Sequence, residues 1–317
     1  MRERSQSSQR EKALSRASQD EIDLVEIWDF LVKGKWIVIG LTLIFSTISV
    51  FYALSLPNMY KSTAVLAPAE SKTSGLAALA NQFGGLASIA GIDLGGGSSD
   101  KTAEALEVIR SWSFIEEFIE EQDIAPEVFA AKGWDLATRE LIFDTSIYDP
   151  VGKKWVREPP KNKKSKPSSW ELYERFQDFI VVEKSIENGF VTLDIEYFSP
   201  ELAKEWAEAL VVKINGLFKS REEFETSQNI SFLKAQIEGT SVSSMQVVFF
   251  NLIEEQTKSL MLAKNTEDFV FSMVSKPRVP EERSSPKRAL ICIFGAMLGG
   301  FLGCIIAQVR GFNSNNG

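Results

Sequence analysis

Two stretches of the chain hold residue types that could do chemistry. Residues 95–102 read GGGSSDKT and resemble a phosphate-binding loop, but that loop needs G-x4-G-K-[ST]. Asp100 occupies the position of the second glycine, where its carboxylate would repel a phosphate. Carboxylates also gather on a predicted exposed helix face, and nothing selects a glycosidase pair among them: Glu116, Glu117, Glu120 and Glu121. We therefore predict neither a nucleotide site nor an identifiable acid–base pair.

The composition removes most other catalytic arrangements. The chain of 317 residues has no histidine, which excludes Ser-His-Asp and Cys-His nucleophiles and His-containing zinc sites. Its two cysteines, Cys292 and Cys304, are too few for a disulfide framework or a four-cysteine metal site. The net charge of -8 does not indicate nucleic-acid binding. We expect no catalytic residue, metal, cofactor or nucleic-acid partner, and hence no enzyme.

Two long apolar blocks set the architecture instead. Residues 36–56 read WIVIGLTLIFSTISVFYALSL and residues 289–309 read ALICIFGAMLGGFLGCIIAQV, both without a charge. As helices, each would reach about 31 Å, which matches a hydrocarbon core of roughly 30 Å. A buried core helix is the alternative for either block. A cleaved signal peptide is a further alternative for the first, but its apolar core would be shorter and nearer the N-terminus. We predict two transmembrane helices.

The spans divide the chain into a tail (1–35), a span (36–56), a large domain (57–288), a second span (289–309) and a tail (310–317). The number of Lys and Arg that flank the spans is the same on the two sides of the membrane: Lys33, Lys35 and Arg310 on one side, and Lys61, Lys287 and Arg288 on the other. Seven Lys and Arg in the first 35 residues favour an internal N-terminus. We expect both tails in the cytoplasm and the large domain outside it.

Within the large domain, the patterns alternate between strands and helices. Strands are expected at 61–66, 179–184, 190–198 and 269–274, with Asn188-Gly189 as the turn of a hairpin. One helix is expected at 101–122, and Ser199-Pro200 supplies the N-cap and first position of another. That helix runs to residue 238, and a second resumes over 242–265. Since a helix of this length cannot bury itself in a compact domain, we predict a protruding helical hairpin at about 200–265 that packs against copies of itself.

Four other segments suggest contacts. Ser18-x-x-Glu21 is a capping box that should open an amphipathic helix before the first span. The Gly-rich stretch 74–99 could touch lipid, glycan or a neighbouring subunit, or be a mobile loop. Residues 153–166 hold seven Lys and Arg and could grip acidic glycan or lipid phosphates, although a solvated surface loop is favoured. In the second span, Gly295, Gly299 and Gly303 recur every four residues and would permit close helix packing, unless they are incidental.

Together these features resemble the polysaccharide co-polymerases, the Wzz-type chain-length determinants of bacterial surface glycans. The likeness runs from IDLVEIWDFL, which begins at Ile22, to Val309. Its sharpest motif is P-x2-P-x4-S-P-K-x11-G-G, which the Pro-rich segment 277–286 and the second span match with Pro277, Pro280, Ser285, Pro286, Lys287, Gly299 and Gly300. The family's glycine run continues with small residues, from which Phe301, Cys304 and Ile305 depart.

The resemblance implies an α+β protein of the bacterial inner membrane. Two transmembrane helices would flank a periplasmic α/β base topped by the long hairpin, and the chain would form a homo-oligomer. It would set how far a Wzy-type polymerase extends a lipid-linked glycan, such as O-antigen or a related lipopolysaccharide or exopolysaccharide. Some relatives carry a C-terminal tyrosine-kinase domain, which we do not expect here because eight residues follow the second span.

Two other classes of protein share parts of this pattern. A capsule-export component of the inner membrane is the closer alternative, and gene position beside an export ATPase would indicate it. A two-span sensor shares the topology but needs a cytoplasmic signalling domain.

Overall fold

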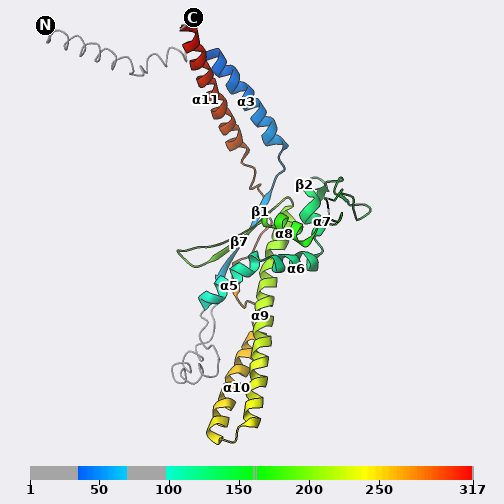
Figure 1. Cartoon of the computed structure of the whole chain (residues 1–317), viewed down its shortest axis with the longest axis vertical. Helices are drawn as coiled ribbons and strands as arrows, with labels where there is room; N and C mark the ends of the chain where they lie inside the picture. Colours follow the sequence, from blue (N-terminus) through cyan, green and yellow to red (C-terminus); the bar gives the residue numbers. More distant parts are fainter. Residues whose placement is uncertain (1–34, 70–97, 160, 162, 316–317) are drawn as a thin grey trace, which may run out of the picture. The chain divides into compact units, whose positions relative to one another are not determined.

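The computed structural model describes residues 35–69, 98–159, 161 and 163–315, in two compact units. One unit holds the two apolar helices, and the other spans Pro57–Ser285. The predicted helix at Ser18 and most of the Gly-rich stretch 74–99 lie outside the described residues. Figure 1 shows the order of the elements along the chain.

The core of the larger unit is built on a four-stranded antiparallel sheet of order β6-β7-β1-β8. Its strands are β1 (Tyr60–Pro68), β6 (Ile180–Lys184), β7 (Val191–Tyr197) and β8 (Phe271–Ser275). Every second residue of β7 is buried, as expected when one face of a strand covers a core. Gly189 has a φ of 71°, which the tight turn between β6 and β7 requires. The hairpin predicted around Asn188-Gly189 is therefore present.

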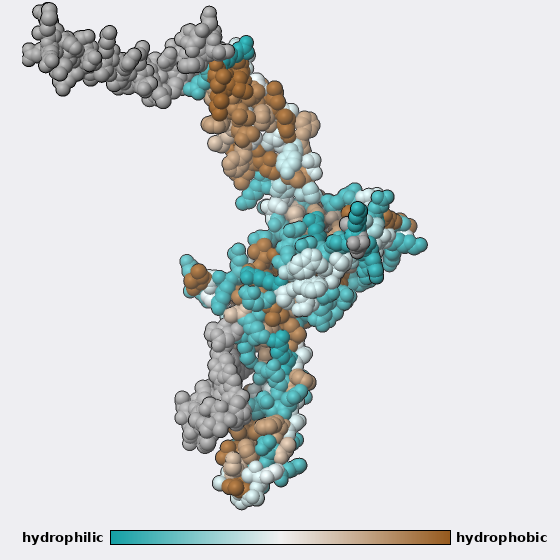
Figure 2. All heavy atoms as spheres, in the orientation of Figure 1, coloured by the Kyte–Doolittle hydropathy of each residue, from teal (hydrophilic) through white to brown (hydrophobic). Residues whose placement is uncertain are grey.

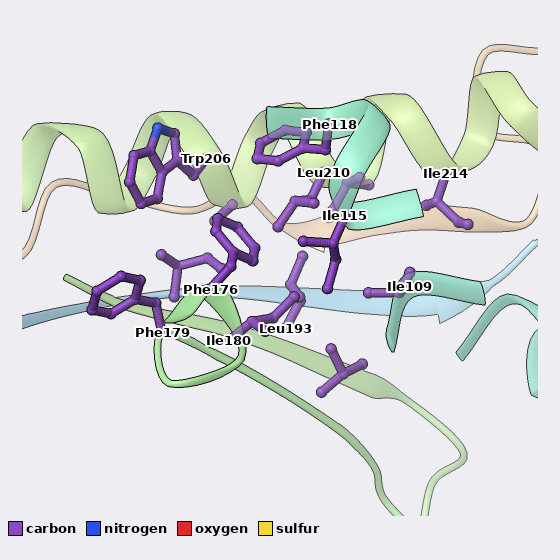
Figure 3. Close-up of a cluster of buried hydrophobic side chains, with 14 of the residues drawn as sticks. Ile109, Ile115, Phe118, Phe176, Phe179, Ile180, Leu193, Trp206, Leu210 and Ile214 are labelled. Carbon is purple, nitrogen blue, oxygen red and sulfur yellow. The ribbon is translucent and has the colours of Figure 1, made fainter. Parts of the chain in front are cut away.

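Helices cover the buried face of this sheet. They are α5 (Ser98–Arg110), α6 (Trp112–Gln122), α7 (Ala125–Ala130), α8 (Ser169–Gln177) and the first half of α9 (Pro200–Gly239). Figure 3 shows their apolar side chains meeting those of the sheet, with Leu210 and Ile214 of α9 near Ile115 of α6 and Leu193 of β7. Burial of this cluster is the main stabilising contribution to the unit.

The prediction of a single helix over 101–122 is wrong, because the helix is interrupted at Ser111. That residue has extended backbone angles (φ −71°, ψ 147°), and its hydroxyl accepts a hydrogen bond from the Phe114 amide. Serine competes for backbone hydrogen bonds in this way and so favours a helix N-cap over a helix interior. The break turns α6 so that its apolar face, including Phe114 and Phe118, is buried in the core.

The predicted helical hairpin is confirmed. Helix α9 has 40 residues, about 60 Å in length, and α10 (Ser243–Lys264) has 22. Ser199 caps α9 by accepting from the Leu202 amide. Beyond Phe218 only Thr226 and Leu233 of α9 are buried, because this half extends past the core and packs mainly on α10 (Figure 1). Near its start, Glu222 also forms an ion pair with Lys101 of α5.

Two small hairpins complete the unit beside α7. The first pairs β2 (Ala131–Asp135) with β3 (Glu140–Phe143), and the second pairs β4 (Tyr148–Asp149) with β5 (Lys154–Trp155). The ring of Tyr148 links the two hairpins, because its centroid lies 5.8 Å from that of Phe143. Within the second hairpin, the Tyr148 centroid lies 5.0 Å from that of Trp155. Together with the sheet and the helical hairpin, they confirm the α+β fold class.

The other unit consists of α3 (Lys35–Ser55) and α11 (Arg288–Asn315), packed side by side. Both helices meet the length and composition that crossing a membrane requires, with mean hydropathies of 2.2 and 2.4 over their most apolar windows. Their surfaces are apolar in Figure 2, and most of their large side chains are exposed.

Candidate functional site

The glycine face of α11 packs on α3 of the same chain. A Cβ atom added to Gly299 would lie 2.8 Å from the Phe45 Cβ and 3.0 Å from the Thr42 Cα, and one added to Gly303 would lie 2.8 Å from the Val38 Cα. A Cβ at Gly295 would collide with Ser49. The three glycines thus occupy the places where the two backbones approach most closely, as small residues do in paired membrane helices.

Gly300 differs from these three, although it stands next to Gly299 in the family motif. A Cβ there would meet only the Thr42 hydroxyl, at an ordinary 3.6 Å. One side-chain hydrogen bond also joins the helices, from Ser49 Oγ to the Ile291 carbonyl at 2.7 Å. In a low-dielectric surrounding such a bond adds to helix association.

The Pro-rich segment 277–286 returns the chain to where the larger unit begins. Ser285 pairs with Met59, whose amide donates to the Ser285 carbonyl at 3.0 Å, and the Ser284 amide donates back to the Met59 carbonyl at 2.8 Å. The Ser62 hydroxyl holds the segment further along by donating to the Arg278 carbonyl. Both ends of the unit therefore leave it side by side.

The motif residues of this segment take different positions. Pro277 is buried, Pro280, Ser285 and Pro286 are half-buried, and Lys287 is exposed. The Lys287 carbonyl accepts from the amides of Leu290 and Ile291, so it begins the hydrogen bonding of α11. The prolines fix an extended path without needing amide partners, which suits a segment that must connect a sheet to a helix.

The basic segment 153–166 is only partly available to a ligand. The Arg157 guanidinium donates to both carboxylate oxygens of Glu171 and to the carbonyls of Lys164 and Ser165. Lys163 also pairs with Glu171 at 3.2 Å. Hydrogen bonds from Arg157 lower the pKa of Glu171 to about 2. The side chains of Arg157 and Glu171 are 89% buried, and their pairing holds the basic segment on α8. The Arg157 guanidinium, which could otherwise bind a phosphate through two hydrogen bonds, is therefore already occupied.

The acidic face of α6 also serves a structural contact. Lys213 of α9 lies 3.3 Å from Glu117 and 2.6 Å from Glu121, so these carboxylates connect two helices. Both carboxylates are more than half exposed, as the exposed-face interpretation of the sequence expects.

The distal half of the hairpin exposes an apolar surface, which we call the hairpin surface. Figure 2 shows it as a brown area at the end of α9 and α10. Its members are large side chains that are more than half exposed: Phe224, Phe232, Val242, Met245, Val247, Phe250 and Met261. Contiguous apolar surface of this kind marks an interaction site in soluble surroundings.

The sequence patterns did not predict a groove in the larger unit. A groove of about 950 Å³ lies among α7, the β2–β3 hairpin, residues 145–151 and the beginning of α9. Its residues are spread over nearly 80 positions, and no motif or spacing relates them. A tryptophan and a run of charged residues around the β2–β3 turn are the only local signals that could have drawn attention to it.

A comparison with protein families supports the resemblance, over a part of the chain that does not include the motif. Residues 20–122 match the family model described as "Wzz: Chain length determinant protein". A solved structure titled "full-length bacterial polysaccharide co-polymerase" is similar, with 15% identity, a TM-score of 0.39, and coverage of 93% of this chain and 99% of that one. A "Fragment of WzzB, Polysaccharide Co-polymerase from Salmonella Typhimurium" matches at 15% identity and a TM-score of 0.29, over 72% of this chain and 100% of that one. Curated proteins yield no match.

Proposed function

Because residues 20–122 match the family model of Wzz-type chain length determinants, we propose that this protein regulates the length of a bacterial surface polysaccharide. It would do so in the inner membrane, with both helices of the smaller unit spanning the bilayer and the Pro57–Ser285 unit in the periplasm. The match to the family model is the observation that carries the proposal. The two apolar helices that bracket an α+β domain agree with it.

We assign the protein a scaffold role without bond-making chemistry of its own. The absence of histidine from the sequence leaves few ways to activate a nucleophile or a general base near neutral pH. A Wzy-type polymerase would make the glycosidic bonds on the lipid-linked glycan, and this protein would decide when extension stops. Its effect would therefore be on the distribution of products rather than on their structure.

The hairpin surface supports self-association. A 40-residue helix that extends past the core after its first half carries apolar side chains that are more than half exposed. A second copy of the hairpin supplies the same apolar chemistry and removes that surface from water. The assembled hairpins would then form the structure that polymerase or glycan meets.

The proposal is tested by deleting the gene and profiling surface polysaccharide on gels. We expect polymer with an unchanged repeat unit and linkage, but without its preferred length class, and complementation should restore that class. The double variant Phe232→Ser/Phe250→Ser in the hairpin surface should reduce cross-linked oligomers and shift the preferred length. Val181→Ser, which changes an exposed residue of β6, is the matched control and should leave both unchanged.

Other outcomes would contradict the proposal. Loss of all surface polymer, with its precursor intact, would indicate an export or polymerising role. An unchanged length profile in every surface glycan of the deletion strain would remove length control altogether.

A further inference from the structure

The groove beside the β2–β3 hairpin combines an apolar wall with convergent polar groups. At about 950 Å³ it has the volume of a small-molecule or oligosaccharide site. Four separate stretches of chain meet there: residue 127, residues 134–143, residues 145–151 and residues 199–205. A site built from such distant segments depends on the fold of the whole unit and is held by its core.

The apolar wall of the groove is supplied mainly by the β2–β3 hairpin. Trp134 and Leu141 are direct cross-strand partners, so their side chains lie on one face of the hairpin. Phe143 and Leu202 extend the wall toward α9. Trp134, Leu141 and Phe143 are half-buried and pack against the main core, which holds them in place and leaves part of their surface in the groove. An aromatic and aliphatic wall of this kind packs well against the C–H faces of sugar rings.

The polar groups of the groove suit a hydroxyl-rich ligand that carries no negative charge. Four carboxylates line it, from Glu127, Glu140, Glu201 and Glu205, together with the guanidinium of Arg139. The carboxylates would repel an acidic glycan or a phosphate. Arg139 is the one cation in the described lining, and it pairs with Glu201. Hydroxyl groups suit both kinds of partner, because they donate to carboxylates and accept from a guanidinium.

One of the four carboxylates is closed off at the edge of the groove. The Oε2 atom of Glu127 is buried and has no hydrogen-bond partner among the described residues. Burial raises the pKa of this carboxyl. The α7 segment that carries it is held by the Tyr197 hydroxyl, which donates to the Glu127 carbonyl at 2.6 Å. An atom that is closed to water is also closed to a ligand oxygen, so Glu127 borders the groove without bonding to its ligand.

We propose that this groove binds a neutral, hydroxyl-rich oligosaccharide segment. The inference rests on the proposed function, in which a growing glycan passes the periplasmic unit, and it names where that glycan is held. The sugar faces would lie on Trp134 and Leu141, and the ring hydroxyls would bond to Glu205 and Arg139.

The test uses the full chain in lipid nanodiscs and oligosaccharides of a few repeats released from the surface polysaccharide of the source strain. Saturation-transfer NMR should show saturable binding. Trp134→Ala should weaken it by about tenfold, since it removes the stacking surface. Glu205→Lys, at an exposed position on α9, should weaken it by about threefold through the loss of one acceptor.

Matched controls separate the groove from the rest of the surface. Trp112→Ala removes an exposed tryptophan outside the groove, and Glu208→Lys makes the same charge change one turn along α9. Both should bind like the wild type. Raising the salt concentration should leave binding unchanged, because a neutral ligand is not held by charge.

Three results would overturn the inference. The wild type could show no saturable binding, Trp134→Ala and Glu205→Lys could both bind as strongly as the wild type, or binding could disappear at high salt. The last would indicate a charged ligand, such as a basic peptide. If length control is lost on gene deletion but kept in the two groove variants, the proposed function is retained and only the role of the groove is rejected.

Discussion

At the scale of single residues, buried polar side chains join distant parts of the chain. Asn215 of α9 is the clearest case, since its Nδ2 donates to the Phe271 carbonyl and its Oδ1 accepts from the amides of Val270 and Phe271. It thereby fixes the start of β8 where the chain returns from the hairpin. Arg157 and Glu171 do the same for the basic segment, with a charged pair instead of an amide.

The Arg157–Glu171 pair should make stability depend on pH. The folded pKa of Glu171, about 2, lies below its ordinary value, so the folded state binds fewer protons than the unfolded state. The stabilisation is complete above the unfolded pKa of roughly 4.3 and is lost as pH falls toward 2. Arg157→Met should lower the melting temperature at pH 7 and flatten its decline between pH 5 and pH 3, measured by circular dichroism of the full chain in detergent.

The control for this prediction is Arg175→Met. Arg175 pairs with Asp178 on the surface, with both side chains at least 40% exposed, and such pairs contribute little. We expect it to melt like the wild type throughout. An Arg157→Met protein with the wild-type pH profile would show that the pair does not stabilise the fold.

At the scale of elements, the contact between α3 and α11 depends on the absence of side chains. Gly299 and Gly303 lie against α3 backbone atoms at distances that no Cβ atom could occupy without movement. Gly300, one residue from Gly299, has room for a methyl group. The two adjacent glycines therefore offer a direct comparison.

Gly299→Ala should weaken the packing of α11 on α3 by about 1–3 kcal/mol, because the added methyl group forces the helices apart. Gly300→Ala should have little effect. Unfolding of the purified chain by denaturing detergent measures the difference, and we expect length control to degrade only in the first variant. Equal stability of the two variants would mean that the glycine face is incidental to packing.

At the scale of the whole molecule, the two apolar helices, as membrane spans, would determine which compartment each segment occupies. The positive charges beside them are balanced, so the orientation follows from the N-terminal Lys and Arg and from the proposed function. Two spans would place both tails on the same side of the membrane, whatever domain lies between them.

Reporter fusions test this arrangement. A periplasm-active reporter joined after residue 60 should be active, and the same reporter at the C-terminus should be inactive. A cytoplasm-active reporter at the two positions serves as the reciprocal control. Equal signals from both positions would contradict a two-span topology.

The sequence alone determined the features that depend on neighbouring residues. The apolar blocks, the alternation along β7, the Asn188-Gly189 turn and the Ser199 cap each lie within a few residues, so hydrophobic periodicity and local hydrogen bonding suffice to predict them. The motif P-x2-P-x4-S-P-K-x11-G-G is also local. The match of residues 20–122 to the family model is a separate observation, and it does not depend on the fold either.

Only the tertiary structure decided which distant residues meet. Ser111 breaks a helix that periodicity alone would continue, because the core needs the apolar face of α6 at a different angle. Arg157 belongs to a basic run in the sequence, yet it is bound by Glu171 across the fold. The groove brings together residues 127, 134 and 205, which no spacing relates. Such contacts follow from how the elements pack, and that packing is set by the burial of the whole core rather than by any single segment.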